Sequence, residues 1–246
     1  MNRIIKIYSN LAAIHQPNFL PWIGFFNKIV LADTFILLDD VQYPKGAGAR
    51  NWINRHLILE NGKQRWATAP ISRNFTGFKN VNEIRFAQDD NWKRSYLNQI
   101  SNSYHKAKNF SETFDFLQFS LAYETEFLSE LNIHLIKSVL RILKISDQTL
   151  RTSSALKKDG KSNHLLCSLI KSVGGDSYLC GAGSSEYLDA KIFESNNIEI
   201  TYQNYRAIEY PQVNTNKFFA GLSIIDALMN CGVNKTRDLV FGVENV

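Results

Sequence analysis

The residues best suited to chemistry are a histidine and two adjacent carboxylates near the start of the chain. His15 follows the apolar run Leu11-Ala-Ala-Ile14, and Asp39 and Asp40 follow the apolar run Thr34–Leu38. A histidine held by a carboxylate is a general-base arrangement, which suits removal of a proton from a nucleophile. Adjacent strand residues point to opposite faces, so at most one aspartate can aim directly at His15. A metal site that uses the histidine and a carboxylate is the alternative chemistry.

Each of these side chains also has a structural interpretation. A lone histidine is usually structural, and a carboxylate at a strand end can hydrogen-bond the loop that follows. The position of His15 between an apolar run and a Pro-Asn-rich turn, opposite two carboxylates, favours a functional role. We therefore predict His15, Asp39 and Asp40 as catalytic residues, and we assign no metal ligand and leave the cofactor unknown.

The elements that must position these residues are typical of a βαβ unit. Leu11–Ile14 predicts a strand, Trp22–Ala32 a helix and Thr34–Leu38 a buried strand. Two strands joined by a helix within about 30 residues are typical of a parallel pair. Since ligands bind beyond the carboxyl ends of such strands, His15 and the aspartates should share one rim.

A loop rich in Gly, Asn and Arg is predicted after the carboxylates, over residues 43–63, with a turn at Asn61-Gly62. A solvated surface is one interpretation of this loop. Anion recognition is the other, because guanidinium groups suit phosphate and carboxylate. The side chains that would serve it are Arg50, Asn51, Asn54 and Arg55.

The rest of the chain predicts an α/β domain. Apolar residues repeat every three or four positions across a helical insertion or subdomain that we place at 87–150. Ser223 and Asp226 have the spacing of a capping box at the start of the last helix. The remaining predicted elements are strands at 66–71, 81–86, 177–180 and 198–205, and helices at 162–173 and 186–194.

A short glycine turn, Gly181-Ala-Gly183, follows one predicted strand and precedes a predicted helix. Its backbone N–H groups could face a phosphate, but a lone GxG pattern is a weak signal and a plain tight turn is the better-supported interpretation. Cys180 invites assignment as a nucleophile, but no histidine lies within ten residues of it in sequence.

Composition excludes several classes of protein. A hydrophobic share of 44% and a charged share of 21% are globular rather than disordered. The net charge of +5 is scattered, which argues against a nucleic-acid partner and remains compatible with a small anionic substrate. The chain shows no signal segment, membrane span or disulfide framework, so we expect a soluble cytoplasmic protein. Its three cysteines are Cys167, Cys180 and Cys231.

Blocks spread along nearly the whole chain resemble the WbqC-like family. This resemblance implies a bacterial protein associated with O-antigen and other surface-polysaccharide biosynthesis. In this family the position of Cys180 is often a serine, which weakens the thiol nucleophile. The blocks are His15-Gln-Pro-Asn-Phe-Leu-Pro-Trp22, Ala32-Asp33, Leu38-Asp-Asp-Val-Gln-Tyr43, Arg50-Asn51, Asn54-Arg55, Asn61-Gly62, Trp66-Ala-Thr-Ala-Pro70, Tyr178-Leu-Cys-Gly-Ala-Gly183, Tyr187-Leu-Asp189, Tyr210-Pro-Gln212 and Leu222-Ser-Ile-Ile-Asp226.

A looser similarity concerns the opening of the chain. A strand, a Pro-Asn turn and Trp22-Ile-Gly-Phe25 at the start of a helix are similar to the HxGH nucleotidyltransferases. Trp22 and Phe25 replace both histidines of that signature, which argues against nucleotidyl transfer. The two resemblances together imply one WbqC-like domain over 1–246, with a Rossmann-like parallel sheet. Besides the loop residues, we predict that Gln16, Asn18, Gln42, Gly181, Tyr210 and Gln212 bind substrate.

Two functions follow as expectations. The first is a transferase that acylates or aminoacylates the amine of a nucleotide-activated amino sugar, with His15 as the base and loop arginines on the phosphates. An acyl-carrier protein could deliver the acyl group, helped by the mildly basic surface. The second is a non-catalytic nucleotide- or sugar-binding accessory protein. A carboxylate within reach of His15 would favour the enzyme, and a His15 bonded only to backbone would favour the accessory protein.

Overall fold

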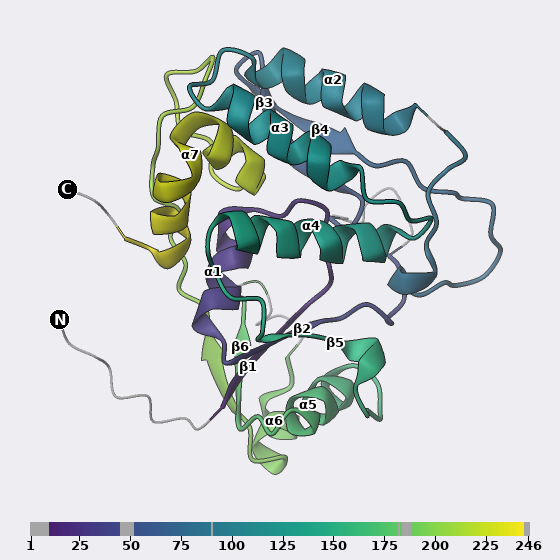
Figure 1. The fold of residues 1–246 in the computed structure, drawn as a ribbon. Coiled ribbons are helices and arrows are strands. Elements are labelled where there is room, and N and C mark those ends of the chain that lie inside the picture. Colours follow the sequence, from purple (N-terminus) through teal and green to yellow (C-terminus); the bar gives the residue numbers. More distant parts are fainter. Residues whose placement is uncertain (1–9, 45–51, 90, 182, 184–187, 244–246) are drawn as a thin grey trace. The chain divides into compact units, whose positions relative to one another are not determined.

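The computed structural model describes residues 10–44, 52–89, 91–181, 183 and 188–243, which form two compact units (Figure 1). The described residues of the first unit are 10–16, 28–38, 148–181, 183 and 188–205. Those of the second unit are 17–27, 39–44, 52–89, 91–147 and 206–243. Each unit is therefore assembled from segments that are far apart in sequence.

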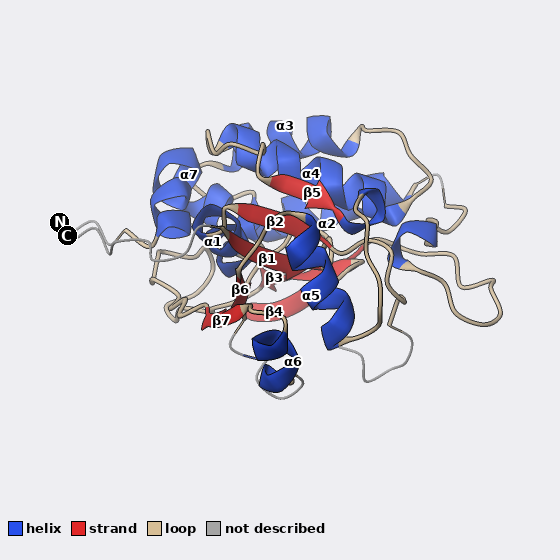
Figure 2. Cartoon of the chain, turned by 90° about the horizontal axis from the view of Figure 1, so that it is seen from below, coloured by secondary structure: helices blue, strands red, loops and turns tan. Residues whose placement is uncertain are grey.

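A five-stranded parallel sheet forms the first unit, with its strands side by side in the order β5-β2-β1-β6-β7 (Figure 2). The predicted α/β class and the parallel opening pair are confirmed: Ala13 of β1 pairs with Phe35 of β2 in parallel, and helix α1 (Ile23–Leu31) connects the two strands. This architecture is consistent with a Rossmann-like fold. The strands are β1 (Leu11–His15), β2 (Thr34–Leu37), β5 (Leu150–Thr152), β6 (Ser177–Cys180) and β7 (Glu199–Tyr202).

Two helices, α5 (Asn163–Ser172) and α6 (Ala190–Ser195), cover one face of this sheet (Figure 1). Alternate residues of a strand point to the same face, so Ala12 and Ile14 of β1 share this core. Tyr178 of β6 stacks on Phe193 of α6, with 5.5 Å between ring centroids. Burial of these apolar side chains holds the helices on the sheet. A short 3-10 helix, Ser153–Ala155, follows β5.

The second unit contains a β-hairpin, four complete α-helices and a 3-10 helix among its described residues. Asn61 and Gly62, which join the two strands of the hairpin, have φ values of 50° and 71°. A two-residue turn of this kind requires positive φ at both positions, so the predicted Asn-Gly turn is confirmed. The elements are β3 (Arg55–Glu60), β4 (Lys63–Thr68), a 3-10 helix (Val81–Glu83), α2 (Trp92–Tyr104), α3 (Phe110–Leu121), α4 (Leu128–Ile142) and α7 (Ile224–Phe241).

Two sequence predictions in this unit were wrong. Strand β3 begins at Arg55, inside the segment predicted as a loop. The prediction missed this strand because its apolar stretch is short, lies between charged residues and follows a polar, glycine-rich segment. Residues 81–86, predicted as a strand, instead begin with the 3-10 helix Val81–Glu83. Glu83 accepts a hydrogen bond from the Asn80 N–H at 2.7 Å, which stabilises this helical turn.

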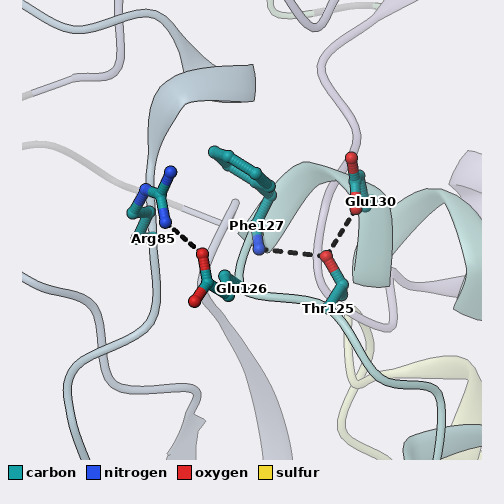
Figure 3. A network of polar contacts seen from close by, with 5 residues as sticks. All are labelled: Arg85, Thr125, Glu126, Phe127 and Glu130. Atoms are coloured by element: carbon teal, nitrogen blue, oxygen red, sulfur yellow. Dashed lines mark hydrogen bonds and ion pairs between the residues drawn. The ribbon is translucent and has the colours of Figure 1, made fainter.

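A polar network holds the start of α4 (Figure 3). Arg85 forms an ion pair with Glu126, and its guanidinium lies 4.5 Å from the ring centroid of Phe127. The Thr125 hydroxyl donates to Glu130 and accepts from the Phe127 N–H at 3.1 Å. Because the first N–H groups of a helix lack partners inside it, such side chains fix where the helix begins.

Helix α7 begins at the predicted residue but without the predicted capping box. The Ser223 hydroxyl accepts from the Ile225 N–H at 3.3 Å, as an N-cap should. The Ser223 N–H, however, donates to the Leu57 carbonyl at 2.9 Å rather than to Asp226. The Asp226 carboxylate is instead occupied by other side chains, described below. Across the described part of the chain, no helix combines the length and apolar character needed to cross a bilayer.

Candidate functional site

The carboxyl edge of the sheet in the first unit is the candidate site. The chain runs from β1 to β2 and β5 on one side of the sheet, then returns to β6 and β7 on the other side. The strand order therefore reverses between β1 and β6. Ligands of open parallel sheets bind at the carboxyl ends of the two strands that flank such a reversal. His15 ends β1 and Cys180 ends β6, followed by Gly181, so the reversal point lies at His15 and Gly181.

The imidazole of His15 is held by the backbone. Its Nδ1 lies 3.0 Å from the Gln16 carbonyl oxygen, which can only accept a hydrogen bond. Nδ1 therefore carries the hydrogen, and Nε2 is the basic nitrogen of the neutral ring. Desolvation and the charge of Lys28 lower the pKa of His15 to about 4, against the opposing effect of the Gln16 bond. The ring is thus neutral at pH 7 and its Nε2 can accept a proton.

Lys28 of α1 supplies a buried cation at the same point. Its side chain is only 4% exposed, and its Nζ donates to the Ile14 carbonyl at 3.0 Å. The ammonium also lies 5.9 Å from the ring centroid of Tyr178. Burial lowers the pKa of Lys28 to about 8, and Cys180 acts in the opposite direction. Most of the lysine is charged at pH 7, so it can attract a phosphate or a carboxylate.

Cys180 is a core residue at the end of β6 rather than a nucleophile. The side chain is fully buried and belongs to the apolar core of the sheet. Burial raises the pKa of the thiol, although the nearby Lys28 opposes this effect. A nucleophilic cysteine needs an accessible thiolate, and neither condition is met here.

The predicted carboxylates lie in the second unit, whereas His15 lies in the first. Asp39 is buried, and its backbone carbonyl accepts from the Asn82 N–H at 2.8 Å. Asp40 is partly exposed. The pairing of the imidazole with a carboxylate therefore stays a prediction. Among the described residues, no group of three or more His, Cys, Asp or Glu side chains is placed to hold a metal ion.

Several predicted substrate ligands also lie in the second unit. Asn54 is buried, accepting from the Tyr43 hydroxyl at 3.0 Å and donating to the Ala69 carbonyl at 2.9 Å. These contacts are structural, and a substrate contact of Asn54 remains a prediction. Asn18 is buried and Gln42 is exposed. The predicted residues Arg50 and Asn51 are outside the described residues.

Tyr210 and Gln212 are brought together on a buried carboxylate that the sequence analysis did not single out as a site. The Tyr210 hydroxyl and the Gln212 amide donate to Oδ1 of Asp226 at 2.8 and 3.1 Å. The Tyr104 hydroxyl donates to Oδ2 at 2.8 Å. Burial raises the pKa of Asp226, and these donors oppose that effect. Tyr210 and Gln212 also line a cavity of about 350 Å³ that includes Lys217.

Lys28 is the site residue that sequence reasoning missed. A signal was present, because it is the one charged residue in the helix of otherwise mostly apolar residues Ile23–Leu31. Long charged side chains are almost never fully buried unless they have a partner. A lone lysine in such a helix therefore predicts a buried acceptor, which is the Ile14 carbonyl in this structure.

The fold is that of an α/β protein with a five-stranded parallel sheet, consistent with a Rossmann-like fold, and the strand reversal is its candidate site. The chain matches the WbqC-like protein family over residues 16–238 and belongs to that family. It is 30% identical over 224 residues to the uncharacterized protein Rv1507c of Mycobacterium tuberculosis, a match that covers 89% of this chain and 93% of the relative. No solved structure matches the chain.

Proposed function

We propose that this protein is a transferase that acylates or aminoacylates the amine of a nucleotide-activated amino sugar in bacterial surface-polysaccharide biosynthesis. The observation that carries the proposal is the neutral imidazole of His15 at the strand reversal. Its Nδ1–H is directed at the Gln16 carbonyl, so Nε2 is the basic nitrogen of the neutral ring. Membership of the WbqC-like family supports the polysaccharide context.

The reaction is a nucleophilic substitution at an acyl carbon. The sugar amine attacks the carbonyl carbon of a carrier-protein thioester, the C–N bond forms and the C–S bond breaks. The proton lost by the amine goes to Nε2 of His15, and the thiol leaves with a proton from the imidazolium. In this proposal the Lys28 ammonium, which lies in the same unit as His15, binds the sugar nucleotide's phosphates. The catalytic roles of Asp39 and Asp40 stay predictions.

Two observations on His15 favour a second function. A general base works best when its pKa lies near the working pH, and the pKa of His15 is lowered to about 4. Its hydrogen bond to the Gln16 backbone is also what a structural histidine would make. These features favour the non-catalytic nucleotide- or sugar-binding accessory protein.

The test compares ligand binding and turnover on matched variants. A panel of UDP- and dTDP-linked amino sugars is first screened by thermal shift, where a ligand at 100 times its Kd stabilises by about 2.7 kcal/mol. For the ligand found, His15→Asn should reduce acyl transfer by roughly 10²–10⁴-fold while affinity is retained. His105→Asn is the matched control, because His105 is an exposed histidine at the end of α2.

Lys28→Met provides the complementary measurement. It keeps a long side chain in the buried position but removes the charge, so affinity for the phosphate-bearing ligand should fall by about tenfold or more. A protein that binds sugar nucleotides with no acyl transfer from any thioester would establish the accessory function. Full activity of His15→Asn would refute the general base, and the absence of any sugar-nucleotide binding would refute both functions.

A further inference from the structure

The chain's four tryptophans all belong to the second unit, and three of them lie together. Trp22 directly precedes α1, Trp52 lies shortly before β3, and Trp66 is a residue of β4. The ring centroids of Trp22 and Trp52 are 5.4 Å apart, and those of Trp52 and Trp66 are 5.0 Å apart. These indoles form a continuous row, called here the tryptophan row.

The tryptophan row keeps aromatic surface in contact with solvent. Trp66 is 37% exposed, and both Trp22 and Trp52 are partly exposed. The fourth tryptophan, Trp92, is only 8% exposed and stacks on Phe86 at 5.0 Å, as a core residue does. Single exposed apolar residues are ordinary, but contiguous exposed aromatic residues mark binding surfaces. The arrangement of three neighbouring indoles therefore requires a functional explanation.

A positive charge lies on the same surface. The guanidinium carbon of Arg55 is 4.2 Å from the ring centroid of Trp66. Both residues lie on one face of the hairpin, because Arg55 pairs with Thr68, two positions beyond Trp66. Lys63 and Arg65 alternate with Trp66 along β4 and therefore lie on the opposite face of the hairpin. The Arg55 cation beside Trp66 thus favours an anionic ligand.

We propose that the tryptophan row binds an acidic oligosaccharide. The C–H bonds on one face of a pyranose ring are attracted to the negative face of an indole. The planes of adjacent indoles are inclined by 55° and 69°, so neither adjacent pair presents parallel rings between which a flat base could insert. Successive rings of a glycan chain can each contact a separate indole. The positive charge of Arg55 attracts uronate or phosphate groups on that chain.

The charge distribution separates a glycan from a nucleic acid. A polynucleotide groove combines stacking aromatic residues with a basic stripe that follows the phosphates. The Trp66 face of the hairpin instead carries one cation, Arg55, and no basic stripe. This arrangement favours the glycan over a nucleic acid.

The test uses hexagalacturonate as the probe. Its binding is measured by tryptophan fluorescence and by calorimetry. Trp92→Phe removes the one tryptophan outside the row, and this variant should retain both the affinity and the fluorescence change. Trp66→Ala should weaken binding by roughly tenfold, as expected for one lost aromatic contact. Arg55→Met should weaken it similarly and reduce its dependence on salt.

The matched control is Phe119→Ala, because Phe119 is an aromatic residue of α3 that is 80% exposed and lies outside the tryptophan row. Trp66→Tyr, with a smaller ring, should have intermediate affinity and keeps the test valid if the alanine variant fails to fold. No binding of hexagalacturonate at about 1 mM would overturn the proposal. Equal affinity for neutral cellohexaose or for hexathymidylate, or an equal loss in Phe119→Ala, would also overturn it.

Discussion

The buried carboxylate of Asp226 should be one of the strongest determinants of stability in the second unit. It is fully buried and accepts hydrogen bonds from Tyr104, Tyr210 and Gln212. Replacing Asp226 by alanine leaves three buried donors without their acceptor. Each orphaned donor costs about 1–3 kcal/mol before relaxation, and loss of one partner in a buried network typically costs about 3–5 kcal/mol in total.

We therefore expect Asp226→Ala to lower the free energy of unfolding by about 3–5 kcal/mol. For a chain of this size, that change corresponds to a fall in Tm of roughly 6–20 °C. Urea titration and calorimetry measure the two quantities. Asp115→Ala is the matched control, since Asp115 is an exposed aspartate of α3. A loss below about 1 kcal/mol, or one no larger than in the control, would refute the assigned role of the network.

The same carboxylate predicts a pH dependence with a definite sign. Burial raises the pKa of Asp226 above 3.8, so the folded state holds this proton more tightly than the unfolded state does. Its contribution is most favourable below pH 3.8 and is lost as pH rises through the folded pKa. The side chain in Asp226→Asn does not titrate. The free energy of unfolding of this variant, measured against pH, should therefore lack the part that comes from Asp226. An unchanged pH profile in that variant would contradict the inferred shift.

Four further outcomes are expected. Asn54→Ala should cost about 1–3 kcal/mol in urea titration, because it removes two buried hydrogen bonds; a neutral effect would contradict this. Gly232→Ala should lower the free energy of unfolding more than Gly242→Ala does. Both glycines have positive φ, but a Cβ at Gly232 would lie 2.8 Å from the Asn109 amide oxygen, whereas a Cβ at Gly242 would meet no atom within 4 Å. Cys180 should resist thiol reagents until urea unfolds the protein, and rapid native labelling would disprove its burial. Burial lowers the pKa of His56 to about 3, so the stability that the neutral ring contributes is lost as pH falls from 6.5 towards 3. His56→Gln should therefore make the free energy of unfolding less dependent on pH over this range.

The local pattern of apolar residues was sufficient to predict the first two strands of the sheet. The apolar runs before His15 and before Asp39 predicted β1 and β2, and the observed bounds agree within one residue. Strands buried on both faces must be apolar throughout, so this signal depends on no distant residue. The Asn61-Gly62 turn was readable for the same reason, because few residues tolerate positive φ at two successive positions.

Strand order and side-chain partners were decided only by the tertiary structure. The return of the chain from β5 to β6, across more than 20 residues, brings Cys180 beside the end of β1 and makes His15 part of a strand reversal. Lys28 follows in a helix, yet its ammonium reaches the Ile14 carbonyl through the fold. The sequence analysis predicted Tyr210 and Gln212 as substrate ligands, whereas in the structure both side chains donate hydrogen bonds to Asp226. A hydrogen bond depends on where two groups meet in space, and for residues far apart in the chain that is determined by the packing of the whole unit.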